Sequence, residues 1–364
     1  MLGVNTRALS RSDTIVLTGS AAAIAAAGVT RYAGVPAVLA FVVAGVAVAL
    51  LASVVGRSVE QLGDRFGPGA TGVLQSALGN LPELFIGFFA LKAGLIAVVQ
   101  AAIIGSILSN ILLVLGLAFL VGGLKHGVQR FNSERARTSM ILMVLATAAL
   151  VLPSLAQYVH APAAPHEKEL SLIVSVVLLG VFVLSLPSAL KRTTAAPDAG
   201  PAAEPAGHGE APRWPLWLAV SLLTVASVAA ALVSDWFVHA LEPAIAALGI
   251  SQAFAGLVIV AIAGNAIENV VGIQLAYRNK ADFAMSVIIQ SPLQIALVLA
   301  PALVLLSLLT ATTLTLVFAP MLVVAVAVTV IAVAFIVFDG ESTWLEGATL
   351  IALYAIIATA FWWG

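Results

Sequence analysis

The sequence predicts an all-α, polytopic membrane protein, and three observations support that class. Of the 364 residues, 62% are hydrophobic and only 9% are charged, whereas soluble domains carry about 25% charged residues. The apolar residues fall into runs long enough to cross a bilayer as helices, which takes about 20 residues. One polar pattern also occurs twice in the chain, which indicates an internal repeat.

The apolar runs predict about eleven transmembrane helices. We interpret the first run as a retained helix, because no small-residue cleavage pattern stands out after it. All six tryptophans lie near the ends of predicted spans, where the membrane interface favours their amphipathic rings. The predicted spans run roughly over Thr14–Ala33, Val35–Val55, Gly69–Lys92, Leu95–Val121, Thr138–Gln157, Leu170–Leu190, Trp214–Val238, Ala253–Tyr277, Phe283–Leu309, Thr312–Phe338 and Trp344–Trp363.

Lysine and arginine predict the orientation of these spans. Of the 16 such residues, only Arg31, Lys92 and Lys168 fall in loops on the side opposite the amino terminus. Because cytoplasmic loops carry the excess of positive charge, we expect a multi-pass protein of a bacterial-type cytoplasmic membrane. Its amino terminus would be cytoplasmic and its carboxyl terminus outside. The net charge of −1 gives no attraction for nucleic acid, so the lipid bilayer is the expected partner.

A segment rich in Ala, Pro and Gly, residues 193–212, divides the chain. It contains too little apolar surface to fold alone, which predicts a flexible cytoplasmic linker. The predicted organisation is a segment with the first helix (1–34), a first five-helix repeat (35–190), the linker with its flanks (191–213) and a second five-helix repeat (214–364).

The repeated pattern is Gly79-Asn80-Leu81-Pro82-Glu83, which returns 185 residues later as Gly264-Asn265-Ala266-Ile267-Glu268. The same offset aligns Ser106 with Ser291. Five spans separate the third predicted helix from the eighth, so the two units would cross the bilayer in opposite senses. This is the inverted-repeat plan of many secondary transporters, whose sites lie at the repeat interface near the midplane.

Glu83 and Glu268 are the predicted centre of a cation and proton site. A carboxylate inside a spanning helix costs at least ~2.5–3.5 kcal/mol, so such residues are usually functional. Oxygen ligands suit Ca²⁺, Mg²⁺ or Na⁺, and the lack of cysteine excludes thiolate metal sites, disulfides and Cys nucleophiles. The oxygen-bearing neighbours predicted to complete the site are Asn80, Ser106, Ser109, Asn110, Asn265, Ser291 and Gln294.

Two carboxylates in one low-dielectric site cannot both stay charged without a cation, so an empty site favours their protonated forms. A metal ion and protons would then compete for the same oxygens, which amounts to exchange. Helix breaks are predicted beside the acids at Gly79, Pro82, Gly264 and Pro292, because irregular backbone at membrane depth is tolerated where it lines a cavity. An ordinary proline kink is an equal alternative at Pro292.

The motifs resemble those of the calcium/proton exchanger (CAX) family, a branch of the calcium/cation antiporter superfamily. The first signature repeat is matched by Gly79–Leu84, Phe89–Lys92, Gly105–Asn110 and Leu112–Gly123, and the second by Gly264–Glu268, Ser291–Leu297 and Pro301. The resemblance implies alternating access, with Glu83 and Glu268 binding Ca²⁺ on one side and protons on the other. It implies a transporter rather than an enzyme, with no cofactor besides the transported ions.

The second repeat departs from the family pattern. Asn269 stands where the family usually has His, Ile267 where it has Ala, and Gln290-Ser291-Pro292 where it has Gly-Ser-Ser. Exchange of Na⁺ or another monovalent cation for H⁺ therefore stays an alternative to Ca²⁺. A structural pair of buried acids, a cation channel and an intramembrane hydrolase are the less favoured hypotheses. Oligomerisation is left open.

Overall fold

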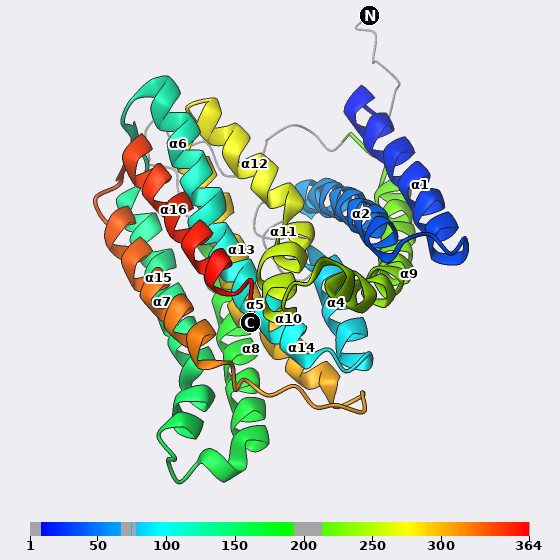
Figure 1. Cartoon of the computed structure of the whole chain (residues 1–364). Coiled ribbons are helices and arrows are strands. Elements are labelled where there is room, and N and C mark those ends of the chain that lie inside the picture. The colour runs from blue at the N-terminus through cyan, green and yellow to red at the C-terminus, as the bar shows by residue number, and fades with distance from the viewer. Residues whose placement is uncertain (1–8, 67–73, 75–77, 193–212, 364) are drawn as a thin grey trace, which may run out of the picture. The chain divides into compact units, whose positions relative to one another are not determined.

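A computed structural model describes residues 9–66, 74, 78–192 and 213–363. Helices make up nearly all of this part of the chain, and its strands are the short β1 (Gln129–Arg130) and β2 (Glu341–Ser342). The helices shown in Figure 1 form two compact units. The first unit comprises Met1–Ile86 and Val183–Ala244, and the second comprises Gly87–Phe182 and Ile245–Gly364. The all-α class is confirmed.

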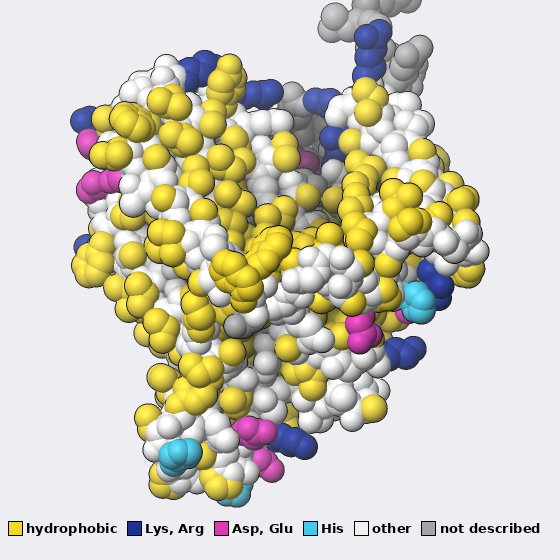
Figure 2. All heavy atoms as spheres, in the orientation of Figure 1, with side chains coloured by type: hydrophobic (Ala, Val, Ile, Leu, Met, Phe, Trp, Pro, Cys, Tyr) yellow, Lys and Arg dark blue, Asp and Glu magenta, His cyan; other side chains and the backbone are white. Residues whose placement is uncertain are grey.

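Eight described helices are long and apolar enough to cross a membrane, and a ninth span is formed if Gln252–Gly264 and Asn269–Tyr277, bent by 63° at their break, are counted together. Part of the predicted span Gly69–Lys92 lies outside the described residues. Hydrophobic side chains cover much of the surface in Figure 2, as expected for helices that face lipid. The eight helices are Arg11–Tyr32, Ala37–Gly63, Ile96–His126, Ser133–Tyr158, Ala164–Ser185, Leu216–Leu248, Ala281–Ser307 and Pro320–Val337.

In the first unit, α1 (Arg11–Tyr32) and α2 (Ala37–Phe66) are joined by a short turn at Gly34, whose φ is +66°. A stacked pair, Phe41 and Phe237, with ring centroids 4.6 Å apart, packs α2 against α9 (Leu216–Leu248). Glycine adopts a positive φ without steric cost because it has no Cβ, so Gly34 allows α1 and α2 to turn back on each other.

A polar network ties the residues that follow the predicted linker to α1 and α2 within the first unit. Asp13 accepts hydrogen bonds from Arg57 Nη1 at 2.6 Å and from Trp214 Nε1 at 3.3 Å. Gln61 Oε1 accepts from the backbone N–H groups of Arg213 and Trp214 at 2.8 and 3.0 Å. The start of α9 is therefore anchored to both α1 and α2.

The second unit is built around two long, largely buried helices. In the most apolar stretch of Ile96–His126, 83% of the residues are buried inside the protein. In that of Ala281–Ser307, 78% are buried. Each contains a π-helical insertion. The elements of this unit are the end of α4 (Leu81–Lys92), α5 (Ile96–Leu108), η1 (Ser109–Val114), α6 (Leu115–His126), α7 (Ser133–Tyr158), η2 (Ala164–His166), the first part of α8 (Glu167–Arg192), α10 (Gln252–Phe254), η3 (Ala255–Val260), α11 (Ala261–Gly264), α12 (Ala266–Tyr277), α13 (Ala281–Gln294), η4 (Ile295–Leu299), α14 (Ala300–Ser307), α15 (Pro320–Val337) and α16 (Trp344–Ala360).

Secondary structure recurs at the same 185-residue offset as the sequence pattern. Helix α4 begins at Leu81 and ends at Lys92, and α12 begins at Ala266 and ends at Tyr277. The π-helix η1 starts at Ser109, and η4 starts at Ile295, one residue past the position that the offset gives. The repeat therefore extends from residue types to backbone conformation.

Two glycines bring α5 and η3 into backbone contact. A Cβ on Gly105 would lie 2.2 Å from the carbonyl oxygen of Leu257, and a Cβ on Gly256 would lie 2.3 Å from that of Val98. Small residues at the points where membrane helices cross allow their backbones to approach closely. This contact holds α5, which carries Ser106, against the segment that leads through α11 to Asn265.

One predicted helix start is wrong. The sequence predicts helix from Thr312, but α15 begins at Pro320 and an extended segment precedes it. Proline fits the first turn of a helix, where its missing N–H is not needed. The extended segment is buried, with Leu316 0% and Phe318 1% exposed, so its backbone groups need partners other than a helix provides.

Side chains supply those partners. Leu316 N–H donates to Ser171 Oγ at 2.9 Å, and Phe318 N–H donates to Ser154 Oγ at 2.9 Å. Gln100 Nε2 donates to the carbonyls of Thr315 and Val317 at 3.1 and 2.8 Å. We call residues 314–318 the buried strap. Serine and glutamine residues on α5, α7 and α8 thus replace the ladder that a neighbouring strand would provide.

Candidate cation site

Asn265 is the centre of a hydrogen-bonded network inside the second unit. It lies between α11 and α12, where the helical segments change direction, and its side chain is 0% exposed. Its backbone N–H bonds to Ala261 O at 3.3 Å. The interruption therefore places the Asn265 amide in the interior of the unit, next to α5 and α13.

The Asn265 side chain uses its full hydrogen-bonding capacity. Its Nδ2 donates to Ser106 Oγ at 3.1 Å and to Ala261 O at 2.9 Å. Its Oδ1 accepts from Asn110 Nδ2 at 3.2 Å and from Ser291 Oγ at 3.1 Å. A primary amide offers two donors and one oxygen with two lone pairs. In this structure Asn265 therefore binds its neighbours and has no lone pair left for a cation.

Asn110 has an oxygen that this network does not use. Its Nδ2 donates to Ser106 O at 2.8 Å as well as to Asn265. Its Oδ1 is buried and has no hydrogen-bond partner among the described residues. An unsatisfied buried acceptor costs about 1–3 kcal/mol, and amide oxygens are good ligands for hard cations. Asn110 Oδ1 is thus the most available cation ligand that the network presents.

The other predicted hydroxyl and amide residues lie near the same helical insertions. Ser109 begins η1, and its Oγ bonds to Ser106 O of its own helix at 3.3 Å. Gln294 is the last residue of α13, directly before η4, and is 6% exposed. π-helical turns often occur at functional sites, because one extra residue re-aims the side chains around it. Pro292 lies within α13 and does not end it.

Asn80 and Glu83 belong to the first unit. They are 8% and 9% exposed, and Glu83 is the third residue of α4. Gly79 and Asn80 form the turn before this helix, so Pro82 falls in its first turn. A carboxylate in the first turn is favoured by the helix dipole. Glu83 is therefore buried at a helix end that stabilises negative charge.

Glu268 occupies the equivalent position in the second repeat. It is the third residue of α12, as Glu83 is of α4; its side chain lies outside what the structure describes. Of the nine residues predicted for the site, the structure joins five in one hydrogen-bonded group: Ser106, Ser109, Asn110, Asn265 and Ser291.

Asn269 is a residue that the sequence argument did not include among the ligands. Its Oδ1 is buried without a hydrogen-bond partner in the described part of the chain, as is that of Asn110. The sequence signal was a third polar residue in the run Asn265, Glu268, Asn269. Among the described residues no group of three His, Cys, Asp or Glu side chains is placed to hold a metal ion.

Comparisons with known proteins show the family of the chain. The family model described as sodium/calcium exchanger protein matches residues 36–190 and 218–363. A Ca(2+)/H(+) antiporter of Synechocystis sp. is 38% identical over 334 residues, covering 88% of this chain and 90% of the relative. The Ca(2+)/H(+) antiporter ChaA of Bacillus subtilis is 37% identical over 327 residues, covering 90% of this chain and 92% of the relative.

Solved structures show the same fold. The structure of native YfkE matches with a TM-score of 0.80 and 34% identity, covering 96% of this chain and 99% of that one. The H+/Ca2+ exchanger CAX matches in fold with a TM-score of 0.73 at 18% identity, covering 97% of this chain and 92% of that one. The chain therefore belongs to the sodium/calcium exchanger protein family, and within it to the calcium/proton antiporter branch.

Proposed function

We propose that this protein is a secondary transporter, not an enzyme, that exchanges Ca²⁺ for H⁺ across a membrane. The observation that carries the proposal is the buried oxygen network around Asn265, together with a glutamate at the third residue of each repeated helix. Relatives named Ca(2+)/H(+) antiporters that match nearly the whole chain at about 37% identity support it.

In this proposal Glu83 and Glu268 carry the exchange. A carboxylate in a low-dielectric site is stable with a proton or a cation but costly when left charged alone. Asn110 Oδ1 completes the cation's coordination, and Asn265 holds Asn110, Ser106 and Ser291 in place. Proton binding on one side of the membrane then releases the cation, and alternating access returns the protonated site.

We also propose that eleven spans form two inverted repeats after an additional first helix. Besides the eight or nine spans above, α16 is a shorter apolar helix and α4 continues a predicted span that lies partly outside the described residues. The 185-residue offset between α4 and α12 supports the repeat. A repeat of five spans inverts the second unit relative to the first, because an odd number of crossings makes the next repeat start from the other side of the membrane.

The proposed location is the cytoplasmic membrane of a bacterium, with a cytoplasmic amino terminus. Within the second unit, β1 pairs with β2, and Gln129 Nε2 donates to Ala276 O at 3.0 Å, so three interhelical connections meet at one end. The basic residues at this end include Lys125, Arg130 and Lys280. An end that carries many Lys and Arg residues is the expected cytoplasmic one, and the bacterial relatives support this membrane.

Na⁺/H⁺ exchange is the second candidate, and one observation favours it. The described side chains of the second repeat offer neutral amide and hydroxyl oxygens, among them Asn269 Oδ1, which is buried without a hydrogen-bond partner in the described part of the chain. Neutral oxygens reduce the preference for a divalent ion, because Ca²⁺ selectivity rises with the number of charged ligands.

Flux into inside-out vesicles tests both candidates. With an acid-inside pH gradient, we expect uptake of labelled Ca²⁺ that collapses when a protonophore removes the gradient, and little uptake of labelled Na⁺. The variants Glu83→Gln and Glu268→Gln should each abolish uptake while the exposed control Glu134→Gln transports normally. Ca²⁺ uptake that ignores the gradient would overturn the exchange, and gradient-driven uptake of Na⁺ alone would replace Ca²⁺ by Na⁺.

A further inference from the structure

The first unit contains a cavity of about 200 Å³ between α1, α2 and α9. Each helix contributes a face with the same spacing: residues 27, 30, 31 and 34 from α1 and its turn, 37, 40 and 44 from α2, and 236, 239, 240 and 243 from α9. Small residues, among them Ala40 and Ala44, leave this space open. Because a liquid water molecule takes about 30 Å³, the cavity has room for a ligand much larger than water.

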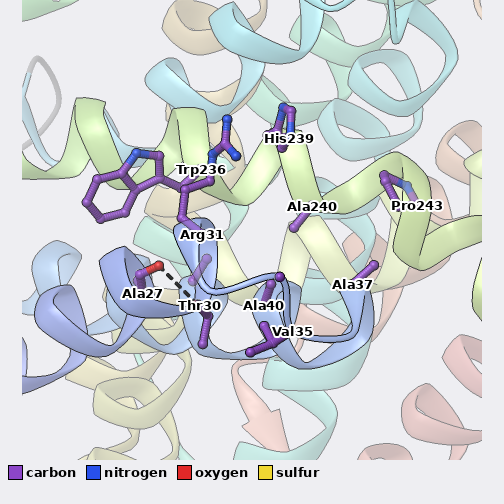
Figure 3. Close-up of a pocket in the computed structure, with 12 residues that line it drawn as sticks. Ala27, Thr30, Arg31, Val35, Ala37, Ala40, Trp236, His239, Ala240 and Pro243 are labelled. Carbon is purple, nitrogen blue, oxygen red and sulfur yellow. Dashed lines mark hydrogen bonds between the residues drawn. The ribbon is translucent and has the colours of Figure 1, made fainter.

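The ionisable groups that line this cavity are basic. Arg31 and His239 are both among the lining residues, and no acidic residue is found among the described residues that line it. Figure 3 shows the Arg31 side chain reaching from α1 toward α9, with Trp236 and His239 on the facing helix. A cationic lining repels Ca²⁺, so this cavity is unsuited to the transported cation and suited to an anion.

Arg31 has hydrogen-bonding capacity to spare. Its Nε is buried and has no hydrogen-bond partner among the described residues. The ion pairs found in the described part of the chain use Arg57, Arg130 and Arg135 instead. A guanidinium presents a planar fork that matches two oxygens of a phosphate or carboxylate. The unused Nε therefore points to an oxyanion that the protein itself does not supply.

The surroundings of the cavity are those of a membrane interface. It lies at the carboxyl end of α1, where Tyr32 is 77% and Val29 is 64% exposed. The Tyr32 ring lies edge-on to Trp236, with centroids 6.3 Å apart, and the Arg31 guanidinium is 5.4 Å from the Tyr32 ring. Amphipathic aromatic rings and arginine at a span end are the groups that meet lipid headgroups.

We propose that this cavity is a binding site for a phosphate oxyanion, with Arg31 as its main ligand and His239 as a second donor. The apolar walls formed by Ala40, Ala44 and Trp236 accept the part of the ligand next to the phosphate. Two sources share this chemistry: the headgroup of an anionic phospholipid, and free phosphate from solution.

The test uses the full chain, purified in detergent and freed of lipid. Its melting temperature is measured against increasing phosphatidylglycerol, diacylglycerol (the same chains without phosphate) and inorganic phosphate. A ligand that binds the folded state raises the melting temperature with its concentration. We expect phosphatidylglycerol to do so and diacylglycerol to have no effect. If inorganic phosphate also raises the melting temperature, the site is assigned to phosphate itself. If inorganic phosphate has no effect, the site is assigned to the lipid headgroup.

Variants locate the effect. Because hydrogen bonds to charged groups contribute about 1.5–3 kcal/mol, Arg31→Gln should raise the half-saturating concentration of phosphatidylglycerol roughly 10- to 100-fold. The control Lys92→Gln removes an exposed lysine at another helix end. It should leave the half-saturating concentration unchanged. Equal responses of the two variants would overturn the proposal. If Arg31→Gln fails to fold, Ala40→Leu provides the second test, because its larger side chain fills the cavity. Ala40→Leu should weaken the binding of phosphatidylglycerol, and binding as strong as that of the wild type would overturn the proposal.

Discussion

Asn110 Nδ2 donates a hydrogen bond to Asn265 Oδ1 at 3.2 Å, although the two residues are 155 positions apart in the chain. The bond joins the start of η1 to the break between α11 and α12. The two asparagines differ in their hydrogen bonding. The Asn265 side chain makes all four of its possible hydrogen bonds, whereas Asn110 Oδ1 is buried and has no partner in the part of the chain that the structure describes.

Asn265→Ala should destabilise the protein, because it leaves groups on Ser106, Asn110 and Ser291 without their partner. Each buried polar group left unsatisfied costs about 1–3 kcal/mol, so we expect a clear fall in the melting temperature in detergent. Thr147→Val is the control, since the buried Thr147 hydroxyl has no partner among the described residues and its removal should cost little. Equal melting temperatures for the two variants would show that the network contributes nothing.

Asn110→Ala should weaken cation binding more than Ser109→Ala does. Asn110 Oδ1 accepts no hydrogen bond from the described residues, whereas Ser109 Oγ donates to the Ser106 carbonyl of its own helix. Losing one oxygen ligand of a charged ion should raise the KM for Ca²⁺ uptake roughly tenfold or more. Initial rates of uptake at varied Ca²⁺ measure this. A larger KM effect from Ser109→Ala would instead make the hydroxyl the ligand.

Ca²⁺ binding should strengthen as pH rises, because the cation needs carboxylates that have lost their protons. If Glu83 and Glu268 both release protons, the logarithm of the apparent dissociation constant should fall with a slope approaching about two per pH unit. In Glu83→Gln the slope should drop to about one. Titrations of the purified protein with Ca²⁺ between about pH 6 and pH 8 would show it, and an unchanged slope would exclude Glu83 as a proton carrier.

Gly105→Ala should disrupt the second unit, because its Cβ would lie 2.2 Å from the carbonyl oxygen of Leu257. The backbones of α5 and η3 would have to separate, and overpacking of this kind costs about 1–3 kcal/mol or more. Gly180→Ala on α8 is the matched control, since nothing lies within 4 Å of its added Cβ. It should be neutral or mildly stabilising. The melting temperatures of both variants decide the point.

Ser171→Ala should cost more stability than Ser175→Ala, one turn further along α8. Both hydroxyls donate to a carbonyl of their own helix, but Ser171 Oγ also accepts the N–H of Leu316 in the buried strap. Removing it leaves that N–H unsatisfied, at about 1–3 kcal/mol. Hydrogen exchange at Leu316 should accelerate in Ser171→Ala alone; protection equal to that of Ser175→Ala would contradict the role of the strap.

The sequence predicted the polar residues of the site better than the course of the backbone. Ser106, Asn110, Asn265 and Ser291 were expected together, because polar residues in matched repeats stand out against apolar helices. The buried strap was predicted as helix, because its residues are as apolar as those of the helices around it. What keeps it extended is a set of partners on α5, α7 and α8, more than 140 residues away.

By itself, the sequence determined the membrane class and the repeated pattern, and it predicted Glu83, Glu268 and their polar neighbours as the site. These follow from composition and spacing, which act locally along a helix. Only the tertiary structure decided that Asn265 is saturated with hydrogen bonds, that Asn110 Oδ1 has no partner among the described residues, and that Arg31 lines a cavity. Hydrogen-bond satisfaction and cavities depend on which distant segments meet, and an isolated helix does not specify its partner.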